Sequence, residues 1–297
     1  MKRKIKVITD NGCDLDDKWL NDNDIHIIKF GLVMDDIEYE GETSNNIDTI
    51  HFYEKLSNGA MPKTNQINPY IARKHIEPFL KEGYDIFYVS FSSGLSGSFS
   101  SVNLACLDLK EEYKNQNIYV IDSLCASLGQ GLFLSYIVDY IKKEVTFDEL
   151  ISYAENLKLR IHHDFTVNDL FHLKRGGRLN ATSAFFGTLF SIKPILHVDN
   201  KGKLIPLDKP RGRISSLKKL VERFINNNEV SEGDPIFISH ANCYNDAIKL
   251  EKMIKDIKPN NKVYINFIGP IIGSHAGQGT IALFYKGKLR TEWEIKK

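Results

Sequence analysis

The chain has 297 residues, enough for about two domains of average size, and its 42% hydrophobic and 26% charged residues are typical of a globular protein. Basic residues number 39 and acidic residues 38, a balance that excludes a global field attracting nucleic acid or an anionic membrane. The four cysteines are scattered without a Cys-x-x-Cys pair, which argues against a zinc site and a disulfide framework.

The beginning of the chain gives no targeting signal. Residues 5–10 are too few and too polar for the apolar part of a signal peptide. No run of about 18 apolar residues predicts a membrane-spanning helix. We therefore expect a cytoplasmic protein.

The first 160 residues alternate between strand and helix patterns. Short apolar runs predict strands at residues 5–8, 25–34 (one strand or a pair), 86–89 and 118–121. Helical spacing predicts helices at residues 14–21, 70–81, 99–113 and 128–143. This alternation is typical of a parallel sheet with helices on both faces, so we expect an α/β N-terminal domain over residues 1–160.

The order of elements changes beyond residue 160. Two apolar runs flank residues 200–203 and predict a β-hairpin. Further helices are expected at residues 214–225 and 244–257, and strands at residues 236–239, 263–268 and 281–285. This mixture predicts an α+β C-terminal domain with a mixed sheet over residues 161–297.

A turn rich in serine and glycine, residues 92–98, lies between a buried strand and a helix start. Ligands of open α/β sheets bind beyond the carboxyl ends of the strands, where free N–H groups and the helix dipole favour an anion. Gly94 and Gly97 let the backbone approach a ligand, and the serines supply hydroxyl donors. The sequence therefore favours a small anionic ligand here, with helix capping by serine as the alternative.

Ser96 in this turn is also a candidate nucleophile. A hydrolase elbow requires Gly-x-Ser-x-Gly, however, whereas residues 94–97 are Gly-Leu-Ser-Gly. No neighbouring motif supplies the base that a serine nucleophile needs. Ligand contact is therefore the favoured role.

A second cluster, residues 269–279, places four glycines around His275 between two apolar runs. Such glycine density is typical of a backbone that closely approaches another group, and histidine can donate a hydrogen bond to an anion whether neutral or charged. The cluster matches neither a Walker A loop nor a dinucleotide fingerprint. We expect a ligand-contacting turn, with a surface hairpin as the alternative.

Arg178 ends a third cluster, residues 174–178, after a predicted helix at 168–173. Arginine at a glycine turn can bind a carboxylate or phosphate through two hydrogen bonds. Solvated charges at a helix C-terminus explain the same residues equally well. Both interpretations stay open from the residues alone.

Two further features of the sequence are explained better by a structural role than by metal or ligand binding. Residues 162–164 are His-His-Asp, but adjacent side chains of a strand point to opposite faces and do not easily chelate one metal ion. An apolar stripe that includes Phe185, Phe186 and Phe190 is more typical of a core than of a ligand wall. The stripe gains interest only if the ligand is a lipid.

Together and in this order, the motifs resemble the DegV family, which includes the fatty-acid-binding subunits of bacterial fatty acid kinase. The resemblance covers nearly the whole chain. It is carried by Val7-Ile8-Thr9-Asp10, Thr64-Asn65-Gln66, residues 92–98, Ile121-Asp122-Ser123, Gly176-Gly177-Arg178, Ile192-Lys193-Pro194-Ile195 and Ser274-His275-Ala276-Gly277-Gln278-Gly279.

The resemblance implies one long-chain fatty acid buried between the two domains. Residues 1–160 would hold its head group, and residues 161–297 would close the acyl pocket. In this family the carboxylate is typically held at the positions that match Thr64, Ser96 and His275 here.

The resemblance also implies a partner. A separate kinase subunit would phosphorylate the bound carboxylate with ATP, giving an acyl-phosphate for lipid synthesis. Ser93, Arg178 and Arg211 would make secondary contacts with ligand or partner. The chain would then be a non-catalytic binding protein with no catalytic residue, no metal and no cofactor beyond the fatty acid. Transient contact with a membrane surface is compatible with this role.

The chain departs from the family in the loop after Thr64. The family usually has Thr-Ser-Gln-Pro, whereas residues 64–69 here are Thr-Asn-Gln-Ile-Asn-Pro. The change begins one residue beyond the expected contact and removes no residue expected to touch the ligand.

Two other functions compete with fatty-acid presentation. A serine esterase or thioesterase would act on acyl substrates through Ser96 and His275. A nucleic-acid regulator would use the basic residues Arg175, Arg178, Arg211 and Arg213. The neutral net charge argues against the regulator.

Overall fold

The computed structural model of the protein describes residues 4–39, 47–168, 170–179 and 191–290. The stripe of Phe185, Phe186 and Phe190 lies outside the described residues. Within the described ranges, no helix is both long enough and apolar enough to cross a bilayer.

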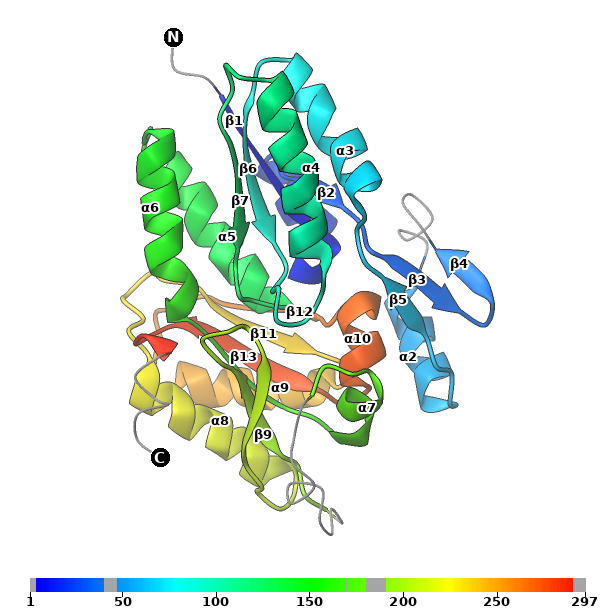
Figure 1. Ribbon diagram of the computed structural model, residues 1–297. Helices are drawn as coiled ribbons and strands as arrows, with labels where there is room; N and C mark the ends of the chain where they lie inside the picture. The colour runs from blue at the N-terminus through cyan, green and yellow to red at the C-terminus, as the bar shows by residue number, and fades with distance from the viewer. Residues whose placement is uncertain (1–3, 40–46, 169, 180–190, 291–297) are drawn as a thin grey trace.

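A four-stranded parallel sheet organises the N-terminal part of the chain (Figure 1). Its strands, in spatial order, are β2 (His26–Ile28), β1 (Ile5–Asp10), β6 (Asp85–Ser90) and β7 (Ile118–Asp122). All three neighbouring pairs run parallel. The predicted α/β class of this part is confirmed.

Helices cover both faces of this sheet because its strands bury alternate side chains on opposite sides. Val7 and Phe87 enter the hydrophobic cluster of α5, whereas Ile8 and Tyr88 enter the cluster of α3 and α4. Figure 1 shows α3 and α4 on one side of the sheet and α5 and α6 on the other. These helices are α3 (Pro69–Lys81), α4 (Ser98–Glu112), α5 (Leu128–Ile141) and α6 (Phe147–Leu157).

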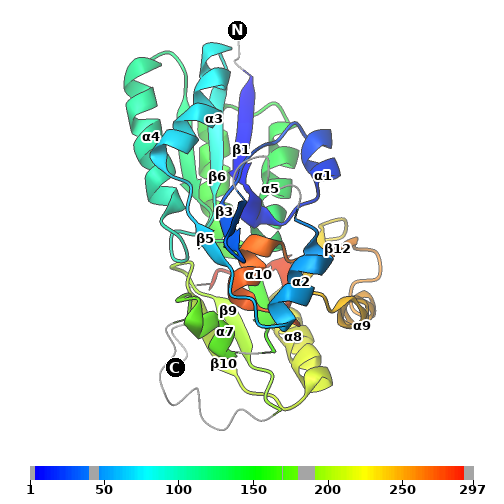
Figure 2. The same cartoon turned by 90° about the vertical axis from the view of Figure 1, so that its right-hand side faces the viewer.

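A small antiparallel sheet projects from the N-terminal part next to α10. Its strands, in spatial order, are β4 (Ile37–Tyr39), β3 (Gly31–Met34) and β5 (Lys63–Asn65). The flanking helices are α2 (Thr49–Ser57) and α10 (Pro270–Ala276). Figure 2 shows α10 beside α2, β3 and β5, so the C-terminal part reaches back to the small sheet.

A six-stranded mixed sheet organises the C-terminal part. In spatial order it contains β10 (Leu204–Asp208), β9 (Ile195–Val198), β8 (Ile161–Thr166), β13 (Ile281–Lys286), β11 (Ile236–His240) and β12 (Val263–Phe267). Among the pairs of neighbouring strands that the structure describes in this sheet, β11 and β12 run parallel and the other four pairs run antiparallel. The predicted hairpin around residues 200–203 and the mixed sheet are confirmed.

The two faces of the mixed sheet have different partners. Ile236 and Ile238 pack against α8 (Arg213–Asn227) and α9 (Tyr244–Lys255). Phe237, between them in the sequence, enters the cluster of α5 instead. One face is therefore covered by its own helices and the other by the N-terminal part.

Three predicted elements need correction. The helix expected at residues 14–21 begins later, as α1 (Asp17–Asp22), because Asn11–Cys13 forms a 3-10 turn and Asp14 has a φ of 53°. The helix expected at 168–173 is α7 (Leu170–Arg175). The expected turn at 269–279 contains a helix, α10, which Pro270 begins at a position where proline is favoured.

Candidate ligand-binding site

A cavity of about 450 Å³ lies between the N-terminal loops and the mixed sheet. This volume is within the range of small-molecule sites. Most of its lining is apolar and comes from both parts of the chain, including Phe30, Phe91, Leu95, Phe165, Leu173 and Ile271.

The topology of the parallel sheet explains why the cavity is here. In the order β2-β1-β6-β7, the chain leaves β1 toward one edge of the sheet and β6 toward the other. Such a switch point opens a crevice beyond the carboxyl ends of the two strands. Phe91, Leu95 and Ser96 follow β6 directly and line the cavity.

Three polar side chains of the cavity come from distant parts of the sequence. Thr64 lies on β5, Ser96 in the turn after β6, and His275 on α10. Thr64 Oγ1 and His275 Nε2 are 2.9 Å apart, within hydrogen-bond distance. The structure therefore places all three residues that the family resemblance indicated in the wall of one cavity, with a direct contact between Thr64 and His275.

The contacts of Ser96 allow its hydroxyl to donate a hydrogen bond to a ligand. Ser96 Oγ accepts the backbone N–H of Ser98 over 3.2 Å and lies 3.1 Å from Ser98 Oγ. Ser98 Oγ also accepts the N–H of Ile67, so the Ser98 hydroxyl can donate to Ser96. The N-cap of α4 is Gly97, which makes no side-chain cap.

His275 is neutral at physiological pH. Burial, the positive charge of Arg178 and neighbouring His172 together lower the pKa of His275 from 6.5 to about 4, against a smaller opposing effect of the Gly176 backbone. Its Nδ1 lies against Gly176 without a hydrogen-bond partner in the part of the chain that the structure describes. Its Nε2 is left to share a hydrogen with Thr64 or with a ligand.

Arg178 joins two of the predicted motifs. Its Nε donates to the carbonyl of Leu95 over 3.2 Å, and its Nη1 donates to the carbonyl of Gly176 over 2.6 Å. Burial lowers the pKa of Arg178. The side chain lines the cavity, but two of its nitrogens are already used to hold the backbone.

Ser93 and Arg211, the other expected secondary contacts, have different positions. Both are exposed, and neither is among the residues that line the cavity. The N–H of Ser93 donates to Asp122 Oδ1 over 3.1 Å. The structure thus separates these two residues from the polar group around His275.

Gly94 lets the serine-rich turn touch the hairpin of β9 and β10. A Cβ at this position would be 2.6 Å from the carbonyl oxygen of Lys201 and 2.7 Å from that of Gly202. Ser92 Oγ donates to the Gly202 carbonyl over 2.8 Å. Glycine is required at residue 94 because any side chain would push the hairpin away.

A buried polar cluster that includes Ser127 and Ser239 of the cavity wall could not be recognised from the sequence. Ser127 Oγ lies 2.5 Å from Asp14 Oδ2 and 3.1 Å from Ser239 Oγ, and the N–H of Gly269 donates to Asp14 Oδ1. Burial raises the pKa of Asp14 to about 7, and its hydrogen bonds only partly offset this. These residues link the two parts of the chain, but isolated serines carry no recognisable motif.

Residues 162–164 are engaged in structural contacts. His163 Nε2 accepts the N–H of Ala126 over 3.1 Å, and its ring lines the cavity. Asp164 pairs with Arg223 of α8 at 2.6 Å. The two neighbours therefore point to opposite faces of β8, as the strand geometry predicts.

A second cavity of about 460 Å³ adjoins the first. Thr64, Arg178 and His275 line both. The other walls of the second cavity include residues 59–63 and Arg175 of α7. The polar group around His275 thus stands between an apolar cavity and one with basic residues in its wall.

Comparison with known proteins agrees with the fold. The model of the family described as "Uncharacterised protein, DegV family" matches residues 4–288. A DegV domain-containing protein of Clostridium perfringens is 38% identical over 292 residues, which cover 97% of this chain and 99% of that protein.

Two solved structures are similar over almost the whole chain. The crystal structure of DegV of Bacillus subtilis, described as a fatty acid binding protein, has a TM-score of 0.82 at 28% identity, covering 97% of this chain and 100% of that one. A DegV family protein of Thermus thermophilus, described for its fatty acid binding, has a TM-score of 0.86 at 22% identity, covering 96% and 100%.

Proposed function

The chain belongs to the DegV family, and we propose that it binds one long-chain fatty acid and presents the carboxylate to a separate ATP-dependent kinase. The acyl chain occupies the apolar cavity, and the carboxylate lies at Thr64, Ser96 and His275. Thr64 and Ser96 from residues 1–160 hold the head group together with His275, and residues 161–297 otherwise close over the acyl chain. The product is an acyl-phosphate, and the use of ATP assigns the reaction to the cytoplasm.

The observation that supports this proposal best is that one cavity has a mostly apolar lining and also contains Thr64, Ser96 and His275 in its wall. An apolar lining suits a hydrocarbon chain, and hydroxyl and imidazole donors suit a carboxylate. The fatty-acid-binding DegV protein of Bacillus subtilis, with the same fold, supports this ligand class.

The energetics require both parts of the site. A sixteen-carbon acid carries about fourteen methylenes, and burying each stabilises the complex by about 0.8 kcal/mol, or about 11 kcal/mol in all. Association costs about 4 to 15 kcal/mol. The chain must therefore be almost fully covered, and hydrogen bonds to the carboxylate, each about 1.5 to 3 kcal/mol, decide the affinity.

The second cavity supports presentation to a partner. Because Thr64, Arg178 and His275 line both cavities, a carboxylate beside them faces the apolar cavity with its chain and the second cavity with its oxygens. Arg175 in the wall of the second cavity favours a phosphate group there. The transient contact with a membrane surface stays a prediction.

The esterase alternative finds less support. A serine hydrolase needs a histidine on the serine and an orienting group behind the histidine. Here His275 Nε2 bonds Thr64, and Ser96 bonds Ser98. Hydrolysis of a nitrophenyl ester that Ser96→Ala abolishes would nevertheless establish the esterase and refute a binding role.

A trapping experiment tests presentation to a kinase. The chain loaded with palmitate is incubated with ATP, with and without a bacterial extract that supplies the kinase, and hydroxylamine converts acyl-phosphate into a hydroxamate. We expect hydroxamate only when chain, palmitate, ATP and extract are all present. Equal yield without the chain, or formation from chain and ATP alone, would contradict the proposal.

A further inference from the structure

The turn that follows α10 has little conformational preference of its own. Gly277 and Gly279 have φ values of 80° and 79°, and glycine has the greatest backbone freedom. Helix α10 has only seven residues, too few for a stable helix without packing. The position of His275 on α10 therefore depends on contacts from other elements.

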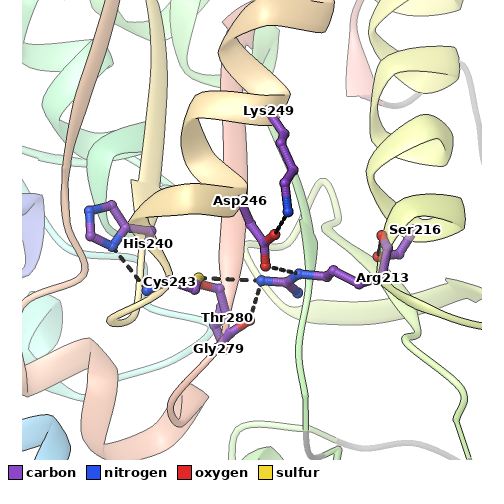
Figure 3. Close-up of polar contacts among 8 residues, drawn as sticks. All are labelled: Arg213, Ser216, His240, Cys243, Asp246, Lys249, Gly279 and Thr280. Atoms are coloured by element: carbon purple, nitrogen blue, oxygen red, sulfur yellow. Dashed lines mark hydrogen bonds and ion pairs between the residues drawn. The ribbon is translucent and has the colours of Figure 1, made fainter.

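Arg213, the first residue of α8, supplies one of these contacts (Figure 3). Its Nη2 donates to the carbonyl of Gly279 over 2.8 Å and lies 3.3 Å from Cys243 Sγ. The N–H of Gly279 donates to the carbonyl of Ala241 over 2.7 Å. Both backbone polar groups of Gly279 are therefore held by other elements of the C-terminal part.

Thr280, which follows the restrained Gly279, is hydrogen-bonded to α10. Its Oγ1 donates to the carbonyl of Ala276, the neighbour of His275, over 2.9 Å. Its own carbonyl accepts the N–H of Ala241 over 2.8 Å. Thr280, Ala276 and His275 all line the apolar cavity. Arg213 is thus linked to the wall of the site through a single turn.

Arg213 is itself fixed in direction. Its Nε donates to Asp246 Oδ2 over 2.8 Å, and Lys249 Nζ donates to the other oxygen of Asp246 over 3.1 Å (Figure 3). The guanidinium group is planar and aims Nε and Nη2 in fixed directions at two separate acceptors, whereas lysine carries all its donors on one nitrogen. Lysine here would keep the charge but lose one of the two bonds.

We propose that Arg213 is a positioning residue for carboxylate recognition, which places His275 opposite Thr64 by holding the carbonyl of Gly279. The inference rests on the proposed function, because it concerns the same carboxylate site. Arg213 is not among the residues lining either of the two cavities described, so it acts through the turn and not on the ligand.

The test compares two ligands with the same tail, palmitate and hexadecanol, by displacement of a fluorescent fatty acid. We expect Arg213→Lys to weaken palmitate binding about 10-fold, since it misplaces one charge-assisted donor, and to leave hexadecanol binding unchanged. Arg223→Lys is the matched control. Arg223 is on the same helix and largely buried, but it pairs with Asp164 on β8, so the ratio of the two affinities should not change.

The His275→Ala background separates positioning from general stability. Because the positioned side chain is absent there, Arg213→Lys should cause no further loss of palmitate affinity. Equal weakening of both ligands, or a further loss in this background, would assign Arg213 a merely structural role and overturn the inference. Should Arg213→Lys fail to fold, Arg213→Gln, whose planar amide retains one donor group, provides the same comparison.

Two outcomes distinguish this inference from the proposed function. If the wild-type chain binds palmitate and Arg213→Lys retains the wild-type ratio of palmitate affinity to hexadecanol affinity, the inference fails and the proposed function stands. If the wild-type chain binds neither ligand, the proposed function fails and the positioning role fails with it.

Discussion

Thr64, Ser96 and His275 each offer a carboxylate a different hydrogen bond. Ser96 offers a hydroxyl hydrogen that the contacts with Ser98 leave available. Thr64 and His275 already share one hydrogen over 2.9 Å, and a carboxylate between them would let both donate. A buried carboxylate would not be tolerated without such donors.

Replacing Ser96 should affect the ligand more than the fold. We predict that Ser96→Ala weakens palmitate binding at least about 10-fold, the value of one hydrogen bond to a charged group, and barely changes the melting temperature. Ser93→Ala is the matched control, since Ser93 is in the same turn but outside the cavity lining. Fluorescent displacement and thermal unfolding measure the two effects. Equal palmitate affinity in both variants would refute the assignment of Ser96.

Only part of this residue pattern could be predicted from the sequence. The turn at 92–98 indicated an anion site, and the resemblance named Thr64, Ser96 and His275 as a group. The sequence does not reveal that Arg178 also holds the backbone, because this depends on its guanidinium group reaching the carbonyls of Leu95 and Gly176. Such contacts arise from tertiary packing, which no local pattern records.

The serine-rich turn and the β9–β10 hairpin approach each other closely at Gly94. We predict that Gly94→Ala lowers the free energy of unfolding by about 1 to 3 kcal/mol through overpacking and also weakens palmitate binding. The reason is that its Cβ would meet the carbonyls of Lys201 and Gly202. Urea unfolding and ligand displacement test the two parts.

Gly233→Ala is the control for this substitution. Gly233 has a φ of 88° and open space around its Cβ position, so alanine there costs about 1 to 2 kcal/mol of backbone strain alone. Stability should fall and palmitate affinity should stay at the wild-type value. A Gly94→Ala chain that binds palmitate as tightly as Gly233→Ala would show that the contact does not shape the site.

The strands could be predicted from the sequence more reliably than some of the helices. Buried strands and the hairpin were identified because their apolar runs are short and bounded by turn residues. The glycines of α10 predict a turn, but packing of this segment against α2 and β5 overrides that preference and it forms a helix. Helix α6 was not predicted, although Thr146 and Glu149 form a capping box that its sequence carries.

Across the whole molecule, burial shifts the titration of many groups, and acid should destabilise the fold. Burial is the largest cause that lowers the pKa of seven histidines, among them His75 and His240; the pKa falls well below 6.5 for His163 and to about 4 for four others. These four are His26, His162, His197 and His275. Between about pH 6.5 and 4 the unfolded chain binds protons at these positions that the folded chain does not, so their contribution to stability falls as pH falls.

Two buried carboxyls act in the opposite direction. Burial raises the pKa of Asp10 and Asp14 to about 7, so the folded chain keeps protons that the unfolded chain has lost above about pH 4. The histidines outnumber these carboxyls. We therefore predict a lower urea midpoint at pH 5 than at pH 6.5, and an equal or higher midpoint at pH 5 would contradict the burial of the histidines.

Because of the arrangement of the two sheets, both parts of the chain are needed to form the cavity. Its lining comes from the loops beyond the parallel sheet, from the mixed sheet and from α10. Neither part alone surrounds a hydrocarbon chain. A ligand that both parts cover should exchange slowly and should accompany the protein through purification.

The most direct measurement of the central claim is therefore the lipid content of the purified protein. The protein is denatured, and the extract is analysed by mass spectrometry and compared with native mass spectra of the intact chain. We predict one long-chain fatty acid per chain, or uptake of one molecule of added oleate or palmitate by a delipidated chain. Absence of fatty acid from the extract, together with no uptake of either acid, would contradict the claim.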